Sequence, residues 1–203
     1  MQGSRTASLI ANKVSCRRGD RLLVRALSFE LHQGEALHVT GANGTGKTTL
    51  IRAAAGLTTP YAGNFAHEGA IGLLDERPAL DPELPLGKAL SFWQVIDGCS
   101  DPSGAIEVLG LAPLLEVPVR YLSTGQRKRA GLAALLNRGV PIWLLDEPLS
   151  GLDVRAIEQV TALIQLHVDG GGIALIASHQ TLAITGLRSL AIEDFAPPAG
   201  ELA

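Results

Sequence analysis

The stretch GANGTGKT, residues 41–48, constrains the fold of this chain more than any other feature. It matches the pattern G-x-x-x-x-G-K-[ST], follows the apolar segment ALHVT and precedes the helical run KTTLIRAAAGL. A strand, a glycine-rich turn and a helix in this order form a phosphate site, because the N–H groups of the turn and the helix dipole point at the anion. The sequence therefore predicts a P-loop. The alternative is a glycine-rich turn that matches the pattern by chance.

The P-loop pattern assigns roles to individual residues. Lys47 is expected to reach the β- and γ-phosphates of a nucleotide, and the Thr48 hydroxyl is expected to bind Mg²⁺. The loop and the residue that follows it make up the predicted nucleotide-binding set, which is Gly41, Ala42, Asn43, Gly44, Thr45, Gly46, Lys47, Thr48 and Thr49.

A second polar feature lies well downstream, in the segment PIWLLDEP. Its apolar residues followed by Asp146 indicate a buried strand with a carboxylate at the carboxyl end, which is where ligands bind in open α/β sheets. Asp146 can hold Mg²⁺ through water, and Glu147 can orient or deprotonate an attacking water. The alternative is an ordinary solvated turn that carries two acids. The P-loop in the same chain makes this alternative less favoured than a metal and water site.

The rest of the chain predicts an α/β fold. Apolar segments of strand length, such as PIWLLD and GIALIAS, alternate with helical runs, which favours a mainly parallel sheet covered on both faces. Residues 75–122 differ, because their apolar residues recur at helical spacing, and we expect a small helical insertion there. A chain of 203 residues fits one domain.

Composition argues against several classes of protein. No apolar run reaches the roughly 18 residues of a membrane-spanning helix, so no membrane insertion is expected. A net charge of −3 argues against a nucleic-acid partner. Cys16 and Cys99 have no metal-ligand spacing and fit a reducing, cytoplasmic location. Four histidines form no metal-ligand spacing and are expected at the surface or in loops: His32, His38, His67 and His167.

One cluster of like charges requires an explanation. A helix is expected from Gln126 onward, and Arg127, Lys128 and Arg129 lie in its first turn. Cations in that position oppose the helix dipole and cost roughly 0.3–1 kcal/mol each. Either the three side chains extend into water, or an anion comes to this end of the helix.

The chain resembles the ATP-binding-cassette (ABC) ATPases at five motifs, which occur in the family's order. Besides the P-loop and LLDEP, LSTGQ at residues 122–126 is similar to the LSGGQ signature motif, SGLD at residues 150–153 is similar to the D-loop, and ASHQ places His179 at the switch-histidine position. The resemblance implies an α/β P-loop NTPase fold of the ABC ATPase type, with a mainly parallel sheet core, a small antiparallel β region and a helical insertion. It implies one ATP-binding domain over residues 1–203, with a RecA-like core at 1–74 and 137–195 and a helical subdomain at about 75–136.

The same resemblance implies that the nucleotide is ATP and that Mg²⁺ binds at Thr48 and Asp146. Glu147, His179 and Lys47 are the implied catalytic residues.

Members of this family dimerise head to tail, so that the signature helix of one subunit faces the γ-phosphate held by the other. The implied ligands at that helix are Ser123 and the backbone N–H groups of Gly125 and Gln126, and Asp153 of the D-loop joins the nucleotide-binding set. The three cations would then form a field that favours closure on ATP. At least two of them, above all Lys128, are still expected in solvent.

Two positions depart from the family pattern. The slot of the aromatic residue that stacks on adenine holds Arg17, whose guanidinium plane can stack on a base; the alternative is an exposed loop arginine. The slot of the Q-loop glutamine holds Arg77, which has no acceptor atom with which to bind a cation. The role of that glutamine is then lost, taken by Glu76, or displaced by one residue in the alignment. Thr124 replaces a signature glycine, which we regard as a tolerable change.

Within the family, the chain most resembles the ATP-binding subunits of the haem exporter of cytochrome c maturation. The likeness lies in LSFELHQGEALHVTGANGTGKTTLIRAAAGL, in the arginine-bearing Q-loop, in LLDEPLSGLD and in GGGIALIASHQ. It implies integral membrane transporter subunits as partners, a dimer of ATP-binding subunits, and a peripheral position on the cytoplasmic face of the bacterial inner membrane. The helical insertion, with ALSFWQVI, is the expected docking surface. The alternatives are the ATPase of another bacterial exporter, for lipids, lipoproteins or drugs, and a soluble non-transport ABC protein.

Overall fold

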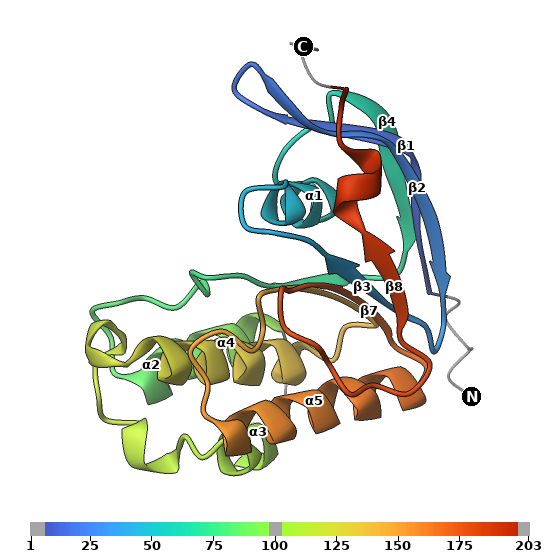
Figure 1. Cartoon of the computed structure of the whole chain (residues 1–203). Helices are drawn as coiled ribbons and strands as arrows, with labels where there is room; N and C mark the ends of the chain where they lie inside the picture. The colour runs from blue at the N-terminus through green and yellow to red at the C-terminus, as the bar shows by residue number, and fades with distance from the viewer. Residues whose placement is uncertain (1–6, 98–102, 199–203) are drawn as a thin grey trace.

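The computed structural model describes residues 7–97 and 103–198, and these form two sheets with helices packed around them (Figure 1). The larger sheet has five parallel strands in the order β5-β6-β7-β3-β8. Its strands are β5 (Ile71–Leu74), β6 (Ile142–Asp146), β7 (Ile173–Ala177), β3 (Ala36–Thr40) and β8 (Arg188–Ala191). The smaller sheet is antiparallel, in the order β2-β1-β4, with β1 (Ser8–Arg18), β2 (Arg21–His32) and β4 (Ala62–Glu68).

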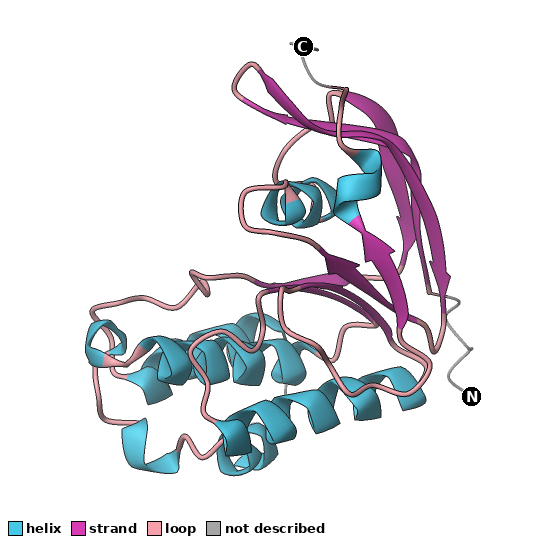
Figure 2. Ribbon diagram, in the orientation of Figure 1, coloured by secondary structure: helices cyan, strands magenta, loops and turns pink. Residues whose placement is uncertain are grey.

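The parallel strands read as almost continuous apolar runs because both faces of the sheet are covered. Every residue of β6 and β7 is buried. Alternate residues of β6 enter different cores: Leu144 packs with α1 (Lys47–Ala54) and the antiparallel sheet, whereas Leu145 packs with the helices of the opposite face. Figure 2 shows this layering, with α1 between the two sheets and the other α-helices on the far side of the parallel sheet.

The helices of that far side are α2 (Leu86–Asp97), α3 (Ser103–Val108), α4 (Thr124–Arg138) and α5 (Val154–Asp169). Helices α2 and α3 pack on α4, and short 3₁₀ turns at Ala112–Leu114 and Val119–Tyr121 lie between α3 and α4. A third 3₁₀ turn, Ile192–Phe195, follows β8. The predicted fold class, a parallel core with an antiparallel β region and a helical insertion, is confirmed.

Two helices begin at a side-chain N-cap. Helix α4 begins at Thr124, ahead of the expected Gln126, because Ser123 is its N-cap. The Ser123 Oγ accepts from the Gln126 N–H at 3.2 Å and the Gln126 Oε1 accepts from the Ser123 N–H at 2.8 Å, which is a capping box. The basic cluster therefore begins at the fourth helical residue, at the end of the first turn. Helix α5 starts after Asp153, whose carboxylate accepts from the Ala156 N–H at 2.8 Å.

None of the described helices combines the length and the apolar character needed to cross a bilayer. Cys16 is a free, buried thiol on β1, and Cys99 lies outside the described residues.

Candidate active site

The P-loop joins β3 to α1 and folds around the side chain of its own lysine. The Lys47 Nζ donates to the carbonyl oxygens of Gly41 at 2.7 Å and Ala42 at 3.1 Å, and Lys47 is only 6% exposed. Gly46 has φ +112°, in the left-handed region, and a Cβ there would lie 3.0 Å from the Cβ of Leu23. The loop therefore needs glycine at that position, and its N–H groups line a concave surface at the N-terminus of α1.

A cleft of about 480 Å³ opens beside this loop. Residues from five separate parts of the chain line it. Four of these parts follow strands of the parallel sheet, whose carboxyl ends meet at one edge, and the fifth is the β1–β2 hairpin. The described lining residues are Arg18, Arg21, Leu23, Asn43, Gly44, Gly46, Lys47, Thr48, Thr49, Glu76, Glu147, Ser150 and His179. Much of the predicted P-loop set, with Glu147 and His179, is thus brought to one cavity.

Asp146 ends β6 beside the P-loop and is 2% exposed. Burial raises the pKa of its carboxyl group, while a hydrogen bond from Thr48 and the charge of Lys128 act in the opposite direction. Among the residues that the structure describes, no hydrogen-bond partner reaches its Oδ1 atom. A buried carboxylate oxygen without a partner, next to a threonine hydroxyl, has the hard oxygen chemistry that Mg²⁺ prefers. These two residues therefore fit the metal predicted from the sequence.

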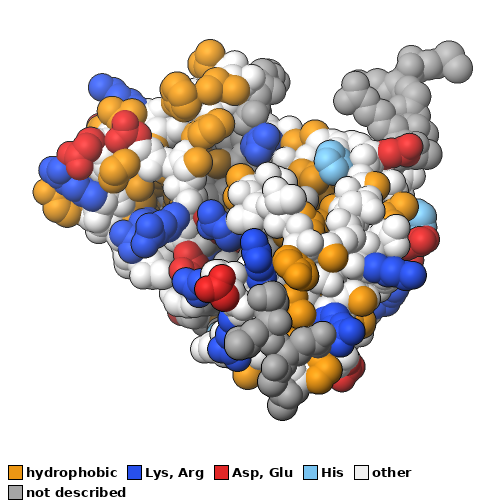
Figure 3. Space-filling model, turned by 90° about the horizontal axis from the view of Figure 1, so that it is seen from above, with side chains coloured by type: hydrophobic (Ala, Val, Ile, Leu, Met, Phe, Trp, Pro, Cys, Tyr) orange, Lys and Arg blue, Asp and Glu red, His pale blue; other side chains and the backbone are white. Residues whose placement is uncertain are grey.

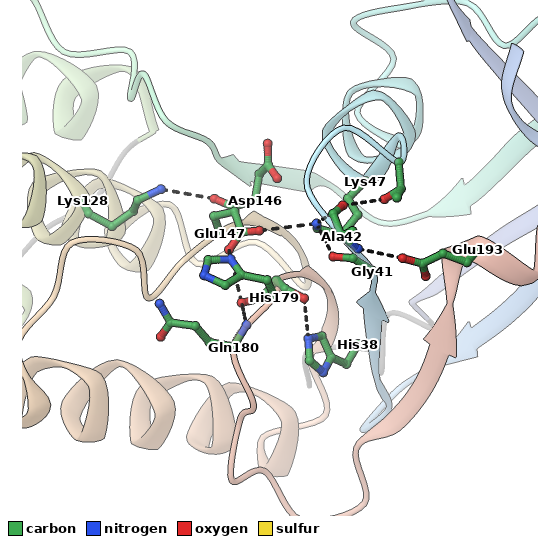
Figure 4. Close-up of polar contacts among 12 residues, drawn as sticks. His38, Gly41, Ala42, Lys47, Lys128, Asp146, Glu147, His179, Gln180 and Glu193 are labelled. Carbon is green, nitrogen blue, oxygen red and sulfur yellow. Dashed lines mark hydrogen bonds and ion pairs between the residues drawn. The ribbon is translucent and has the colours of Figure 1, made fainter. Parts of the chain in front are cut away.

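Glu147 lies at the centre of the polar contacts in Figure 4. Its Oε2 is 2.9 Å from the His179 Nδ1 and accepts from the Ser178 Oγ at 3.3 Å, and its Oε1 is 3.8 Å from the Lys47 Nζ. The residue has φ +47°, a sparsely populated conformation for a side chain with a Cβ. Backbone strain of this kind often accompanies a functional site, and here it directs the carboxylate across the ends of β6 and β7.

His38 is a buried residue of the same region that the sequence did not single out. It lies on β3, is 6% exposed, and its Nε2 is 3.1 Å from the carbonyl oxygen of Ser178, the residue before His179. Burial lowers the pKa of His38. The expectation of a surface position is wrong for His38 and also for His167, which stacks on Trp143 with ring centroids 3.8 Å apart. The signal that could have placed His38 inside was its position between Leu37 and Val39, in a strand whose first four residues are all buried.

The signature residues lie away from this cleft. Ser123, Gly125, Gln126 and Asp153 are not among the described residues that line it. Ser123 is exposed at the start of α4. Gly125 packs against the D-loop so closely that a Cβ there would lie 2.5 Å from the carbonyl oxygen of Gly151.

The three cations of α4 have different environments, and the expectation for Lys128 is wrong. Lys128 is 5% exposed, not solvated, and its Nζ lies 3.2 Å from the carbonyl oxygen of Asp146 (Figure 4). Arg129 donates to the carbonyl oxygen of Leu109 at 2.9 Å. Arg127 is half-buried. The sequence could not reveal this difference, because the groups that attract Lys128 come from distant segments.

Arg17, expected at the adenine-stacking position, is not among the described residues that line the cleft. Its guanidinium lies over the ring of Tyr61, 5.2 Å from the centroid, while Arg18 and Arg21 line the cleft. The pairing of β1 with β2 is irregular between Cys16 and Arg17. Such a bulge re-aims the side chains that follow it. The arginines of this hairpin that face the cleft are therefore Arg18 and Arg21.

The Q-loop segment brings Glu76, not Arg77, to the cleft. The Arg77 N–H donates to the Asp75 Oδ1 at 2.8 Å, which fixes the turn after β5. Of the three alternatives left open by the sequence, this placement favours the one in which Glu76 takes the position near the metal site.

Comparison with known proteins agrees with the class that the fold and cleft define, an ATP-hydrolysing P-loop protein. The model of the ABC transporter family matches residues 24–150, and the chain belongs to that family. The chain is 54% identical to the cytochrome c biogenesis ATP-binding export protein CcmA of Novosphingobium aromaticivorans over 93% of this chain and 97% of the relative. It is 45% identical to the protein of the same name from Zymomonas mobilis, over 96% of this chain and 89% of the relative.

A solved structure with the same fold is a putative ABC transporter ATP-binding protein from Pyrococcus furiosus. The TM-score is 0.79 at 20% identity, and the match covers 94% of this chain and all of that one. At this identity the similarity shows the fold alone.

Proposed function

We propose that this chain is the ATP-hydrolysing subunit of the haem exporter of cytochrome c maturation. The observation that supports this most directly is the cleft lined by the P-loop lysine, Glu147 and His179, with Asp146 buried next to Glu147. Residues arranged in this way suit phosphoryl transfer from ATP to water. The names of the relatives, which refer to cytochrome c biogenesis and export, indicate the process that this hydrolysis would drive.

The chain's own residues account for the steps of hydrolysis. The P-loop N–H groups and Lys47 bind the phosphates, so the lysine exchanges its contacts with Gly41 and Ala42 for phosphate oxygens. Thr48 and Asp146 would hold Mg²⁺, and the bound cation would supply positive charge beside the phosphates. Glu147 orients a water molecule and accepts its proton as the oxygen bonds to the γ-phosphorus and the bond to ADP breaks. His179, 2.9 Å from Glu147, keeps that carboxylate in place.

The exposed start of α4 supports a second phosphate-binding surface, which would act on the nucleotide of another subunit. In a head-to-tail dimer, Ser123 with the N–H groups of Gly125 and Gln126 would bind the γ-phosphate held by the second subunit. Asp153, at the start of α5, would lie beside that site. The capping box that now joins Ser123 to Gln126 would give way to the phosphate.

We assign the base-binding end of the cleft to Arg18 and Arg21, in place of Arg17. Both line the cleft at the end formed by the β1–β2 hairpin, beside the apolar Leu23. A guanidinium plane stacks on a base without reading its edge, so discrimination between ATP and GTP should be weak.

The helical side of the molecule carries the surface that we assign to the membrane subunits. Phe92 is 58% exposed, Val95 84% and Ile96 58%, all on α2. Figure 3 shows hydrophobic side chains gathered on that side. An apolar patch of this kind suits a partner's helix or loop. Attachment there would hold the subunit at the cytoplasmic face of the inner membrane.

The test is the c-type cytochrome content of cells whose only copy of the gene encodes Glu147→Gln. Haem staining of denatured membrane and periplasmic fractions should show loss of every covalent haem band, with b-type haem unchanged. Glu158→Gln, an exposed position on α5, is the matched control and should leave the bands intact. Normal bands in the Glu147→Gln cells would overturn the cytochrome assignment and favour the ATPase of another exporter.

A further inference from the structure

Lys128 is the buried cation that the proposed chemistry leaves without a role. Its side chain runs from α4 to the edge of the parallel sheet (Figure 4). There the Nζ donates to the carbonyl oxygen of Asp146 at 3.2 Å and to that of Asp75 at 3.4 Å. Asp146 is the last residue of β6, and Asp75 follows the last residue of β5. One ammonium group thus joins a helix to the ends of two neighbouring strands.

Packing alone does not account for a lysine at this position. The buried face of α4 is otherwise built from alanine, glycine and leucine, and burying an ammonium group costs several kcal/mol unless partners compensate. Burial lowers the pKa of Lys128, and the charges of four carboxylates oppose that shift: Asp146, Glu76, Asp75 and Glu147. The cation is retained at an acidic strand edge, and all four of these acids belong to the site or adjoin it.

Lys128 contacts Asp146 just beyond the end of the hydrogen-bonded pairing between β5 and β6. Strand β5 pairs with β6 only as far as Leu74 opposite Leu145, so the Asp146 carbonyl has passed the end of that ladder. Lys128 supplies the missing donor on this side. On the other side the Glu147 N–H donates to the carbonyl oxygen of Ala177 at 2.8 Å. The peptide unit between Asp146 and Glu147 is therefore fixed at both its oxygen and its nitrogen.

The orientation of this peptide determines where both acidic side chains point, because one precedes it and the other follows it. Glu147 holds φ +47°, which is sparsely populated and persists only when its surroundings impose it. We propose that Lys128 is a positioning residue that, by fixing the Asp146–Glu147 peptide and the Asp75 carbonyl, sets the metal-binding and water-orienting carboxylates in place. This inference rests on the proposed Mg²⁺ site. Through Lys128, helix α4 would also couple the position of Ser123, its N-cap, to the positions of Asp146 and Glu147.

Metal affinity separates this role from a structural one. The variant is Lys128→Met, which keeps the length of the side chain and removes the donor, and the control is Lys88→Met, an exposed lysine on α2. Binding of a fluorescent ATP analogue in EDTA measures the P-loop alone. Mn²⁺ binding in the presence of a non-hydrolysable ATP analogue, followed by electron paramagnetic resonance, measures the carboxylates.

We expect Lys128→Met to bind the metal-free nucleotide within about two-fold of wild type and to bind Mn²⁺ about 10- to 100-fold more weakly, the usual effect of removing an outer-shell partner. Turnover should fall in kcat more than in KM, and Lys128→Arg, which keeps a donor, should recover most of the Mn²⁺ affinity.

Mn²⁺ affinity in Lys128→Met equal to or above that of wild type would overturn the inference, as would an equal loss of metal-free nucleotide binding. A wild-type chain that bound the nucleotide analogue but no Mn²⁺ would overturn the proposed metal site and this inference with it.

Discussion

The contact between α4 and the D-loop gives a quantitative prediction for Gly125→Ala. The added Cβ would lie 2.5 Å from the Gly151 carbonyl oxygen, a backbone atom that cannot rotate away. Relief requires α4 and the loop to separate by about 0.5 Å or more, since contacts under about 3 Å are not tolerated. Overpacking of this kind costs about 1–3 kcal/mol, which for a domain of this size lowers Tm by roughly 2–12 °C.

The assay is thermal and urea unfolding of Gly125→Ala beside Gly104→Ala. Gly104 lies in α3, and a Cβ there meets nothing within 4 Å, so the same substitution should be neutral or stabilise by up to about 1 kcal/mol. ATP hydrolysis should also fall in Gly125→Ala, because the N–H groups at the start of α4 move away from their proposed phosphate. Equal unfolding free energies in the two variants would refute the packing argument.

Three further outcomes follow from the site. Glu147→Gln should reduce ATP hydrolysis by about 10²- to 10⁴-fold while ATP binding persists, and unchanged steady-state turnover would remove Glu147 from the proton transfer. Arg18→Ala should weaken ATP binding about two- to five-fold and Arg17→Ala should not, as measured with a fluorescent analogue; the reverse order would return the base to Arg17. Burial lowers the pKa of His38 below its unfolded value, so the free energy of unfolding that depends on neutral His38 is fully present above about pH 6.5 and is lost as pH falls toward the folded pKa. In urea unfolding between about pH 5 and 7, His38→Gln should reduce this dependence of the unfolding free energy on pH. An unchanged pH dependence in the variant would contradict the argument.

The sequence predicted the parallel core and the sheet edge that carries the candidate site, because both depend on local patterns. The P-loop, the strand that ends in Asp146 and the switch motif each occupy a few adjacent residues, and parallel strands bring their carboxyl ends together without further information. The capping box around Ser123 was also visible as S-x-x-Q, yet apolar periodicity alone indicated a helix start at Gln126, which is later than the observed start at Thr124.

Two placements depend on effects that no local pattern records. The bulge beside Arg17 decides which of two adjacent arginines faces the cleft, and a shift of one residue moves a side chain to the opposite face of a strand. Lys128 resembled a surface residue because its partners, at Asp75 and Asp146, are remote in sequence and meet it only in the folded sheet.

The apolar face of α2 also matters before the subunit meets any partner. A newly made chain presents Phe92, Val95 and Ile96 to water, and burying this surface against another copy is favourable in the same way as burying it against a membrane subunit. The isolated subunit should therefore self-associate reversibly as its concentration rises. Synthesis together with its partner would shorten that exposure, so the yield of dispersed protein depends on the timing of assembly as well as on folding.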